Sequence, residues 1–228
     1  MLKFYYSLAP NPMKVALILE EAALPYEAIA VDTRKGEQHG AALMALNPNA
    51  KVPVIVDGPT TVFDSNAILL YLAEKTGQFL PEATPQNRGE LLSWLLFIAS
   101  GIGPFTGQCV HFKHYAPEPN PYALNRYDFE AWRHWTVLND RLATRSFVVG
   151  EGYTIVDMAL WAWARAVPFA LGADAWDRLP HVKRLFDTVN ARPAAQRAAA
   201  LKDRHAFKTD MDDESRRAMF PQNERLKG

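Results

Sequence analysis

Cysteine is scarce in this 228-residue chain: with Cys109 as its single cysteine, the chain cannot form an internal disulfide. A disulfide-stapled secreted domain is therefore excluded, and we expect a reducing, cytoplasmic compartment. The formal net charge is zero, because 25 basic residues balance 25 acidic ones. Without an excess of positive charge to neutralise phosphates, we expect no nucleic-acid partner.

Long apolar runs are also lacking. The most apolar later stretch, residues 158–171, contains Arg165 and Pro168 and is shorter than the roughly 20 residues that cross a bilayer. The chain begins with Lys3 close to its start and without an apolar secretion segment. We therefore expect no membrane span and no membrane partner. What the chain does have is an apolar content of 49%, enough to bury a large core in one or two domains.

The first 80 residues alternate strand patterns with helical patterns. The expected order is strand, helix, strand, helix, strand, strand and helix, over residues 2–7, 13–23, 26–31, 40–46, 52–56, 61–63 and 65–76. Strands separated by a helix favour parallel pairing, whereas the last two, joined by the turn at residues 57–60, favour an antiparallel hairpin. This order predicts a thioredoxin-like domain over residues 1–80, of the α+β class, with a mixed four-stranded sheet.

Beyond residue 80 the patterns become long and helical, and all six tryptophans lie there. The two prolines of residues 81–86 predict a linker, and residues 87–201 predict an all-helical domain. Its expected helices cover residues 87–114, 122–144, 155–171, 181–191 and 194–201. Residues 202–228 have few apolar anchors and predict a C-terminal tail that is either loosely ordered or draped over the body.

A candidate anion site lies between the first strand and the first helix, where the sequence reads Ala9-Pro10-Asn11-Pro12. The free N–H groups at a helix start favour an anion. A thiolate there would also gain from the helix dipole and from an amide donor, which lower its pKa. Because the segment has no cysteine, the thiol must arrive with a ligand. Alternatively, Asn11 is simply the N-cap of the helix.

Two further segments complete the candidate site. The bond between Val52 and Pro53, at the entry to a strand, is a candidate cis peptide, which would leave Val52 free to pair with a peptide ligand. Lys51 beside it either holds a carboxylate or is a solvated surface charge. At the next helix start, Asp64 suits an ammonium and Ser65 a carboxylate, unless the pair is an ordinary helix cap. Together the segments suit a small peptide with a thiol, an amine and two carboxylates.

The run from Phe63 to Glu74 closely resembles the third-helix signature of the cytosolic glutathione transferases. Residues 47–53 and 152–157 extend the resemblance, which covers nearly the whole chain. Within that superfamily the chain is most similar to the bacterial nu class, whose members act on glutathione disulfides. The supporting segments are residues 10–11, 35–38, 101–104 with 107–108, and 121–127.

The resemblance implies glutathione as co-substrate, no metal, and a homodimer. Asn11 would contact the glutathione sulfur as the catalytic residue, and Arg133 would reach a bound glutathione across the dimer interface. The other implied contacts are Gln38 and Lys51 at the glycyl end, Val52 and Pro53 at the cysteinyl backbone, and Asp64 and Ser65 at the γ-glutamyl end. The family's threonine two positions before Asn11 is Ala9 here.

That departure removes one hydroxyl directed at the sulfur, and Ser7, Tyr5 or Tyr6 is expected to compensate. The implied activity is disulfide reduction by thiol–disulfide exchange, transfer of glutathione to electrophiles, or both. The second substrate would be a small electrophile or disulfide. Two alternatives stay open: a non-catalytic glutathione-binding or regulatory protein, and a glutathione-dependent lyase or isomerase.

Some other sequence patterns are weaker indications of a functional site. Cys109, His111 and His114 have metal-like spacing but no fourth ligand nearby, so we expect no metal site. Cys109 is expected either to pack in the core or to line an acceptor pocket, and Trp161 and Trp163 are expected to be core residues. Aromatic walls of that pocket are expected from Phe105, Phe112, Tyr115 and Trp132.

Overall fold

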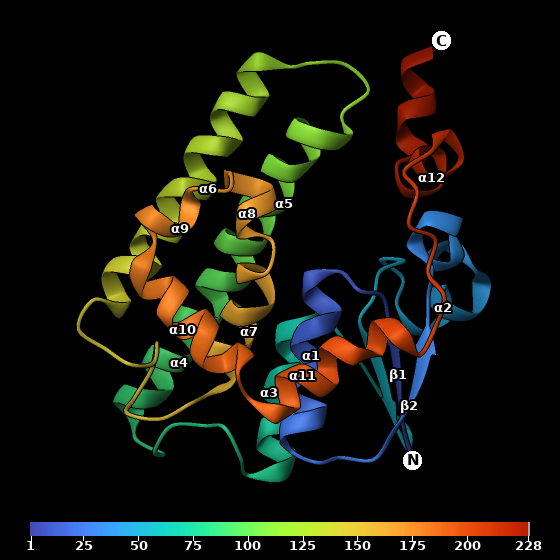
Figure 1. The fold of residues 1–228 in the computed structure, drawn as a ribbon. Helices are drawn as coiled ribbons and strands as arrows, with labels where there is room; N and C mark the ends of the chain where they lie inside the picture. The colour runs from blue at the N-terminus through green and yellow to red at the C-terminus, as the bar shows by residue number, and fades with distance from the viewer. Residues whose placement is uncertain (228) are drawn as a thin grey trace.

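The protein is described by a computed structural model that covers residues 1–227, in which a small mixed sheet packs beside a larger group of helices (Figure 1). The strands are β1 (Leu2–Tyr6), β2 (Tyr26–Ala30), β3 (Val54–Asp57) and β4 (Thr60–Phe63). The helices are α1 (Pro10–Glu21), α2 (Ala41–Leu46), α3 (Ser65–Thr76), α4 (Pro85–Phe97), α5 (Gly103–Val110), α6 (Pro121–Leu142), α7 (Ile155–Ala164), α8 (Val167–Leu171), α9 (Ala175–Arg178), α10 (Pro180–Asn190), α11 (Pro193–Ala199) and α12 (Asp213–Met219). Short 3-10 turns are η1 (Thr33–Lys35), η2 (Glu37–His39), η5 (Ala200–Asp203) and η6 (Pro221–Lys227), and π-helical turns are η3 (Ile98–Ile102) and η4 (His111–Tyr115).

The four strands form one mixed sheet in the order β2-β1-β3-β4, which confirms the predicted fold class. β2 runs parallel to β1, and β3 runs antiparallel to both β1 and β4. The expectation that helix-separated strands pair in parallel holds for β1 and β2 but is wrong for β3. With six residues, α2 is about 9 Å long, too short to carry the chain back along the sheet, so β3 starts at the end where β2 finished.

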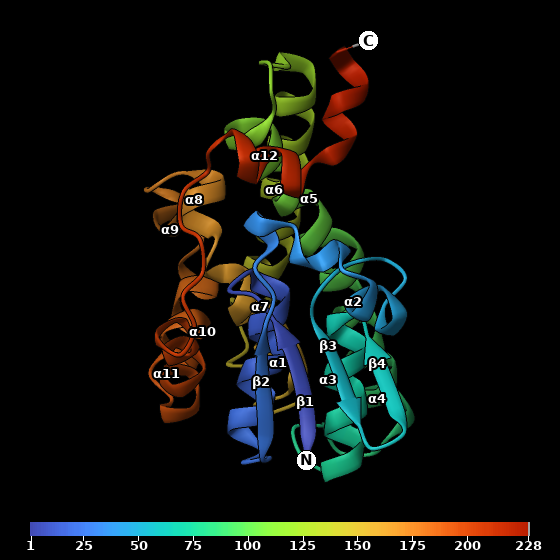
Figure 2. The same cartoon turned by 90° about the vertical axis from the view of Figure 1, so that its right-hand side faces the viewer.

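Alternation along β1 divides the packing between the two faces of the sheet. Leu2, Phe4 and Tyr6 are buried in the main core, which includes α1, α3 and the helical region. Tyr5 points to the other face and packs beside Leu43 of α2 in a second, smaller core. Helix α1 is therefore enclosed by the sheet on one side and by α7 on the other, as both views show (Figures 1 and 2).

The helical region follows the predicted pattern with three differences, one of which is that the short helix α9 was not predicted. A single helical stretch extends over Pro85–Tyr115, so its start lies inside the segment that was expected to be a linker. The helix expected over residues 155–171 breaks between α7 and α8, because Pro168 in the first turn of α8 has no N–H to continue the ladder.

Pro85–Tyr115 is also long and apolar enough to cross a membrane by length and composition, and 39% of its most apolar window is buried inside the protein. A helix that packs in a protein core has the same apolar content, and this stretch packs on α6 and α7. The expectation of no membrane span was based on residues 158–171 and stays a prediction.

The C-terminal tail is draped over the body. Figure 2 shows it leaving α11, passing the β2 side of the sheet and ending in α12 and η6 above it. Its first anchor is the Tyr6 hydroxyl, which donates to the carbonyl of Leu201 at 3.2 Å and lies 2.7 Å from Nδ1 of His205. Further along, α12 packs on η1.

Candidate active site

Strand register gathers the three predicted site segments at one edge of the sheet. Tyr5, near the carboxyl end of β1, pairs with Val54 at the start of β3, and Val54 pairs with Phe63 at the end of β4. The loop into α1, the segment before β3 and the first residue of α3 therefore leave the sheet side by side. This arrangement places the N-termini of α1 and α3 at the same edge.

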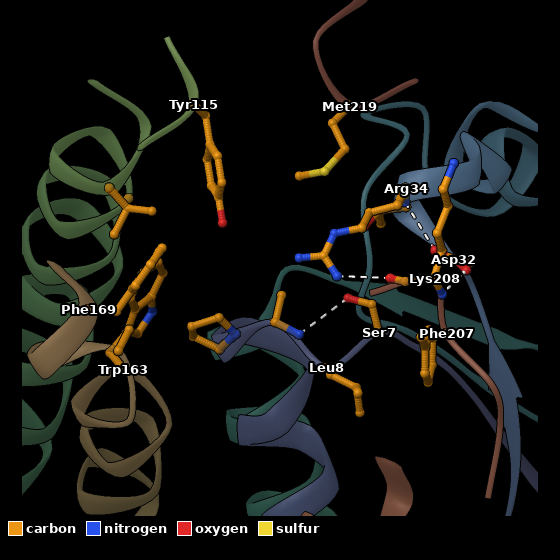
Figure 3. Close-up of a pocket in the computed structure, with 16 residues that line it drawn as sticks. Ser7, Leu8, Asp32, Arg34, Tyr115, Trp163, Phe169, Phe207, Lys208 and Met219 are labelled. Atoms are coloured by element: carbon orange, nitrogen blue, oxygen red, sulfur yellow. Dashed lines mark hydrogen bonds between the residues drawn. The ribbon is translucent and has the colours of Figure 1, made fainter. Parts of the chain in front are cut away.

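A cavity of about 390 Å³ opens at this edge, beside the start of α1 (Figure 3). One wall consists of Ser7 to Pro10, and the facing wall is formed by helical-region residues that include Trp163 and Phe169. The tail supplies a third wall. The remaining residues that line the cavity are Asp32, Thr33, Arg34, Gly107, Val110, Tyr115, Ala166 and, from the tail, Phe207, Lys208 and Met219.

Asn11 lies in the first turn of α1, and the alternative that it is the N-cap is wrong, because Ala9 occupies that position without a side-chain hydrogen bond. The indole Nε1 of Trp163 donates to Oδ1 of Asn11 at 3.0 Å. An indole N–H can only donate, so the amide oxygen faces the ring and Nδ2 is left as a donor. Among the described residues, no acceptor bonds to Nδ2. Trp163 was expected to be a core residue, yet it also lines the cavity.

Of the three hydroxyls expected to compensate for Ala9, only that of Ser7 lines the cavity. The side chain of Ser7 is buried, and its Oγ accepts from the backbone N–H of Ala9 at 3.5 Å, so it sits at the start of α1. The Tyr6 hydroxyl is directed to Leu201, and burial raises its pKa. Tyr5 packs in the smaller core on the other face.

The segment before β3 is positioned as expected in one respect. The Val52–Pro53 peptide bond is cis, and Val52 is half-buried while Lys51 is exposed. The loop is held by Asn47, whose Nδ2 donates to the carbonyl of Lys51 at 2.7 Å. In the described part of the chain no residue forms an ion pair with Lys51, so its ammonium is open to a ligand.

Asp64, one of the two residues considered as a cap, is the N-cap of α3. Its Oδ1 accepts from the N–H groups of Asn66 at 2.8 Å and Ala67 at 3.1 Å. The backbone of Asp64 has φ of 69°, a left-handed conformation that Asp and Asn tolerate better than most residues. Ser65 is buried in the first turn. The carboxylate of Asp64 is thus fixed at the surface while Ser65 lies just beneath it.

Lys14 is a site residue that the sequence analysis missed. Its side chain is 1% exposed, and its Nζ donates to Oγ of Ser65 at 3.2 Å and to Oδ1 of Asn66 at 3.1 Å. Burial lowers its pKa to about 7, although the nearby charge of Asp64 acts in the opposite direction. The sequence signal that could have identified it is that Lys14 is the one charged residue in the run Pro12–Leu19. In the structure every residue of that run is buried.

None of the predicted site residues lines the cavity itself. The segments of Asn11, Val52 and Asp64 lie at the same edge of the sheet, whereas Gln38 and Arg133 are engaged elsewhere. Gln38 is buried beneath the tail, where its Nε2 donates to the carbonyl of Ala218 at 3.2 Å and its Oε1 has no partner among the described residues. Arg133 lies on α6 and pairs with Glu130 at 2.8 Å, and this ion pair lowers the pKa of Glu130.

The tail is held against the cavity by an element that sequence analysis did not single out. Arg34 in η1 donates from Nη1 to the carbonyl of Lys208 at 2.8 Å, and the N–H of Lys208 donates to Oδ2 of Asp32 at 2.7 Å. Figure 3 shows Phe207 and Met219, from this tail, on the side of the cavity opposite Trp163. With so few apolar residues, the tail gave no pattern from which this contact could be predicted.

Cys109 packs in the core and does not line the cavity; burial raises its pKa to about 11. Its thiol points to the carbonyl of Ala170 at 3.5 Å, and His114 lies 2.9 Å from the carbonyl of Phe169. In residues 1–227, no group of three or more His, Cys, Asp or Glu side chains is placed to hold a metal.

Of the expected aromatic walls, Tyr115 alone lines the cavity. Phe105 packs on His134, and Phe112 stacks on Tyr127. Trp132 is covered by the guanidinium of Arg178 at 3.6 Å.

Comparison with known proteins agrees with this geometry. Residues 9–75 match the family model described as "Glutathione S-transferase, N-terminal domain", and residues 132–193 match "Glutathione S-transferase, C-terminal domain". The disulfide-bond oxidoreductase YfcG of Escherichia coli is 41% identical over 87% of this chain and 94% of its own length.

Solved structures give the same result. A glutathione transferase family member from Pseudomonas fluorescens, with two glutathione bound, has a TM-score of 0.81 and 38% identity, covering 86% of this chain and 91% of its own. A glutathione transferase from Pseudomonas putida, with one glutathione disulfide bound per subunit, has a TM-score of 0.81 and 35% identity over 86% of this chain and 90% of its own. This chain therefore belongs to the glutathione S-transferase family.

Proposed function

We propose that this protein is a glutathione-dependent enzyme that reduces disulfides by thiol–disulfide exchange at the N-terminus of α1. The observation that carries the proposal is the orientation of Asn11. Trp163 holds its amide oxygen, which leaves its N–H groups as donors at a helix start with no thiol of its own. An amide donor and the positive end of a helix dipole both stabilise a thiolate.

The proposed reaction has two exchange steps. A glutathione thiolate attacks one sulfur of a disulfide, the S–S bond breaks, and the departing thiolate takes up a proton. A second glutathione thiolate then attacks the glutathione sulfur of the mixed disulfide and releases the second thiol. Two glutathione molecules are oxidised to glutathione disulfide as one substrate disulfide is reduced. The protein's part is to bind, orient and ionise the first thiol.

The proposed glutathione contacts follow the edge of the sheet. Asp64 takes the γ-glutamyl ammonium, Ser65 takes the neighbouring carboxylate, and the backbone of Val52 with Pro53 receives the cysteinyl segment. Lys51 is left to attract the glycyl carboxylate. Gln38 is proposed at the same end, and it reaches a ligand only when the tail residue Ala218 releases its amide.

Homodimer formation is part of the proposal, since Arg133 does not reach the cavity of its own chain. Two large apolar side chains are exposed on the helical region, Leu96 on α4 (59%) and Phe129 on α6 (60%), the latter four residues before Arg133. Burial of such residues favours association. In the proposed dimer, Arg133 of each chain approaches the glutathione of the other. Since the reaction needs reduced glutathione, the reducing cytoplasm stays the predicted compartment.

Transfer of glutathione to electrophiles is the second proposed activity. It requires the same thiolate and an apolar acceptor site, and the aromatic side chains of Trp163, Phe169, Tyr115 and Phe207 around the cavity suit one. The name of the Escherichia coli relative, a disulfide-bond oxidoreductase, favours disulfides as the main substrates. A non-catalytic role is favoured only by Ala9, and the hydroxyl of Ser7 at the same helix start offsets that loss.

The proposal is tested with 2-hydroxyethyl disulfide and 1-chloro-2,4-dinitrobenzene at matched glutathione. Asn11→Ala should lower disulfide turnover about tenfold or more, since a lost donor to a charged acceptor costs roughly 1.5–3 kcal/mol. Asn11→Asp is the control of equal size, and its negative charge should lower turnover further. Turnover of neither substrate by the unaltered protein, despite glutathione binding by calorimetry, would establish the non-catalytic alternative instead.

A further inference from the structure

The ammonium group of Lys14 determines which way the Ser65 hydroxyl points. A lysine ammonium donates hydrogen bonds and accepts none, so Oγ of Ser65 must be the acceptor of the 3.2 Å contact. The hydroxyl hydrogen is then directed away from Lys14. No described residue accepts it, and no described residue bonds to the backbone N–H of Ser65. Both donors therefore stay available at the N-terminus of α3.

Loss of the proton from Lys14 would reverse this arrangement. A neutral amine has a lone pair and accepts a hydrogen bond, so the Ser65 hydroxyl could turn inward to donate to Nζ. The hydroxyl donor for a carboxylate at the start of α3 would be lost along with the positive charge behind it, and only the backbone N–H of Ser65 would remain. With a pKa lowered to about 7 by burial, Lys14 changes protonation close to neutral pH.

Few other charges face Lys14. Asp64, at the cap of α3, is the charged side chain that acts on it. On β1, Lys3 is exposed. The remaining charged residues on helices that pack against α1 are engaged elsewhere: Asp157 of α7 with the N–H groups of Val148 and Thr154, Arg197 of α11 with Glu20, Glu74 of α3 with Arg88, and Lys75 of α3 with Asp57.

We propose that Lys14 is a positioning residue that makes the Ser65 site selective for a carboxylate, and that its protonation controls the affinity for the γ-glutamyl end of glutathione. Lys14 does not touch the ligand; it acts through Ser65. This inference rests on the proposed function, because it requires the γ-glutamyl carboxylate to bind at Ser65. It adds a pH-dependent control of binding that is separate from ionisation of the glutathione thiol.

The test compares two ligands with blocked sulfurs. S-methylglutathione carries the γ-glutamyl carboxylate, whereas S-methyl-(4-aminobutanoyl)cysteinylglycine keeps the amine and lacks that carboxylate. Calorimetry at pH 6.0 and pH 8.5 should show S-methylglutathione binding about 5–10-fold more tightly at the lower pH. The analogue should bind with nearly the same affinity at both. Both ligands lack a free thiol, so thiol ionisation does not contribute.

Lys14→Met removes the charge at similar size, and Lys14→Gln removes it but keeps a donor. Either variant should bind S-methylglutathione about tenfold more weakly at pH 6.0, lose the dependence on pH, and bind the analogue as before. The kcat for 2-hydroxyethyl disulfide at saturating glutathione should change less than twofold. If neither variant folds, the comparison of the two ligands on the unaltered protein still decides the matter.

Ser65→Ala distinguishes a failure of the Lys14 proposal from a failure of the proposed glutathione contacts. Weaker S-methylglutathione binding in Ser65→Ala, with unchanged binding in both Lys14 variants, would overturn the role of Lys14 and leave the proposed site intact. Equal weakening of both ligands by the Lys14 variants would reduce Lys14 to a structural residue. If Ser65→Ala binds S-methylglutathione normally, the carboxylate is elsewhere, and the proposed glutathione contacts fail together with this inference.

Discussion

The indole N–H of Trp163 donates to the side-chain oxygen of Asn11 across 3.0 Å, so a residue of the helical region fixes the amide in the first turn of α1. Gly103 leaves room for the ring, whereas a Cβ at Gly107 would only be in ordinary van der Waals contact with it. A Cβ at Gly103 would be 3.3 Å from the indole and one at Gly107 would be 3.7 Å from it. The region with the sheet supplies the Asn11 side chain, which we propose as a donor for the thiolate, and the helical region sets its orientation.

Trp163→Phe should therefore lower kcat/KM for 2-hydroxyethyl disulfide about fivefold, because a neutral hydrogen bond contributes about 1 kcal/mol to the position of Asn11. Trp161→Phe is the matched control on the same helix, since the Trp161 indole donates to Asn190 at 3.3 Å, away from the cavity. That control should lose stability but keep its kcat/KM. Equal losses of kcat/KM in the two variants would contradict a specific role for Trp163.

Asp64 is predicted to have two separable roles, a cap and an ammonium contact. Asp64→Asn keeps an oxygen acceptor for the cap and a residue that tolerates φ of 69°, but it removes the charge. Its glutathione KM should rise about tenfold while its Tm stays the same. Asp64→Ala should also lower the Tm, because loss of a cap costs about 1 kcal/mol. An unchanged KM in Asp64→Asn would leave Asp64 as a cap only.

Cys109 should be dispensable for chemistry. Its thiol is buried, and with a pKa of about 11 it has almost no thiolate at neutral pH. Cys109→Ser should keep at least half of the disulfide-reductase activity. Intact-mass spectrometry during turnover should find no adduct on the protein, and a mixed disulfide at Cys109 would overturn the mechanism in which only glutathione cycles.

Phe207 of the tail should influence the acceptor and leave glutathione unaffected. It lines the cavity and packs edge-on against Tyr6, with ring centres 5.6 Å apart. Phe207→Ala should raise the KM for 1-chloro-2,4-dinitrobenzene several-fold, since burying an aromatic ring contributes about 1–2 kcal/mol. The KM for glutathione should change less than twofold. Phe220→Ala is the control, because Phe220 packs on His111 outside this cavity.

Lys14 should destabilise the fold in a way that depends on pH. Its pKa is about 7 in the folded protein and higher in the unfolded chain, so the unfolded chain holds more protons between these values. The destabilisation is full below pH 7 and disappears as the pH rises towards the unfolded pKa. Lys14→Met should therefore be more stable at pH 6.5, on the order of 2–4 kcal/mol.

Urea unfolding at pH 6.5, 8.0 and 9.5 checks this prediction. The difference in unfolding free energy between Lys14→Met and the unaltered protein should shrink as the pH rises. A constant difference would show that Lys14 has the same pKa in both states. If Lys14→Met is more stable than the unaltered protein but binds S-methylglutathione more weakly, the buried charge of Lys14 serves binding at the expense of stability.

The local parts of this protein were predictable from its sequence, because they depend on residues close together in the chain. The period of apolar residues predicted strands and helices, and the pair Asp64 and Ser65 indicated the start of α3, where Asp64 is the cap. The absence of cysteine from the start of α1 predicted that any thiol at this helix N-terminus must arrive with a ligand.

Contacts between distant residues were decided only by the tertiary structure. Trp163 has no local pattern that distinguishes a core tryptophan from one that bonds to Asn11, because that depends on how α7 packs on α1. Burial of Lys14 likewise depends on how the other elements pack on α1, including α3, whose Ser65 and Asn66 accept its hydrogen bonds. The covering of Gln38 by Ala218 depends on a polar tail whose path is set by hydrogen bonds and packing to residues far away in the sequence. Periodicity records which face of a segment is apolar, whereas packing decides what that face meets.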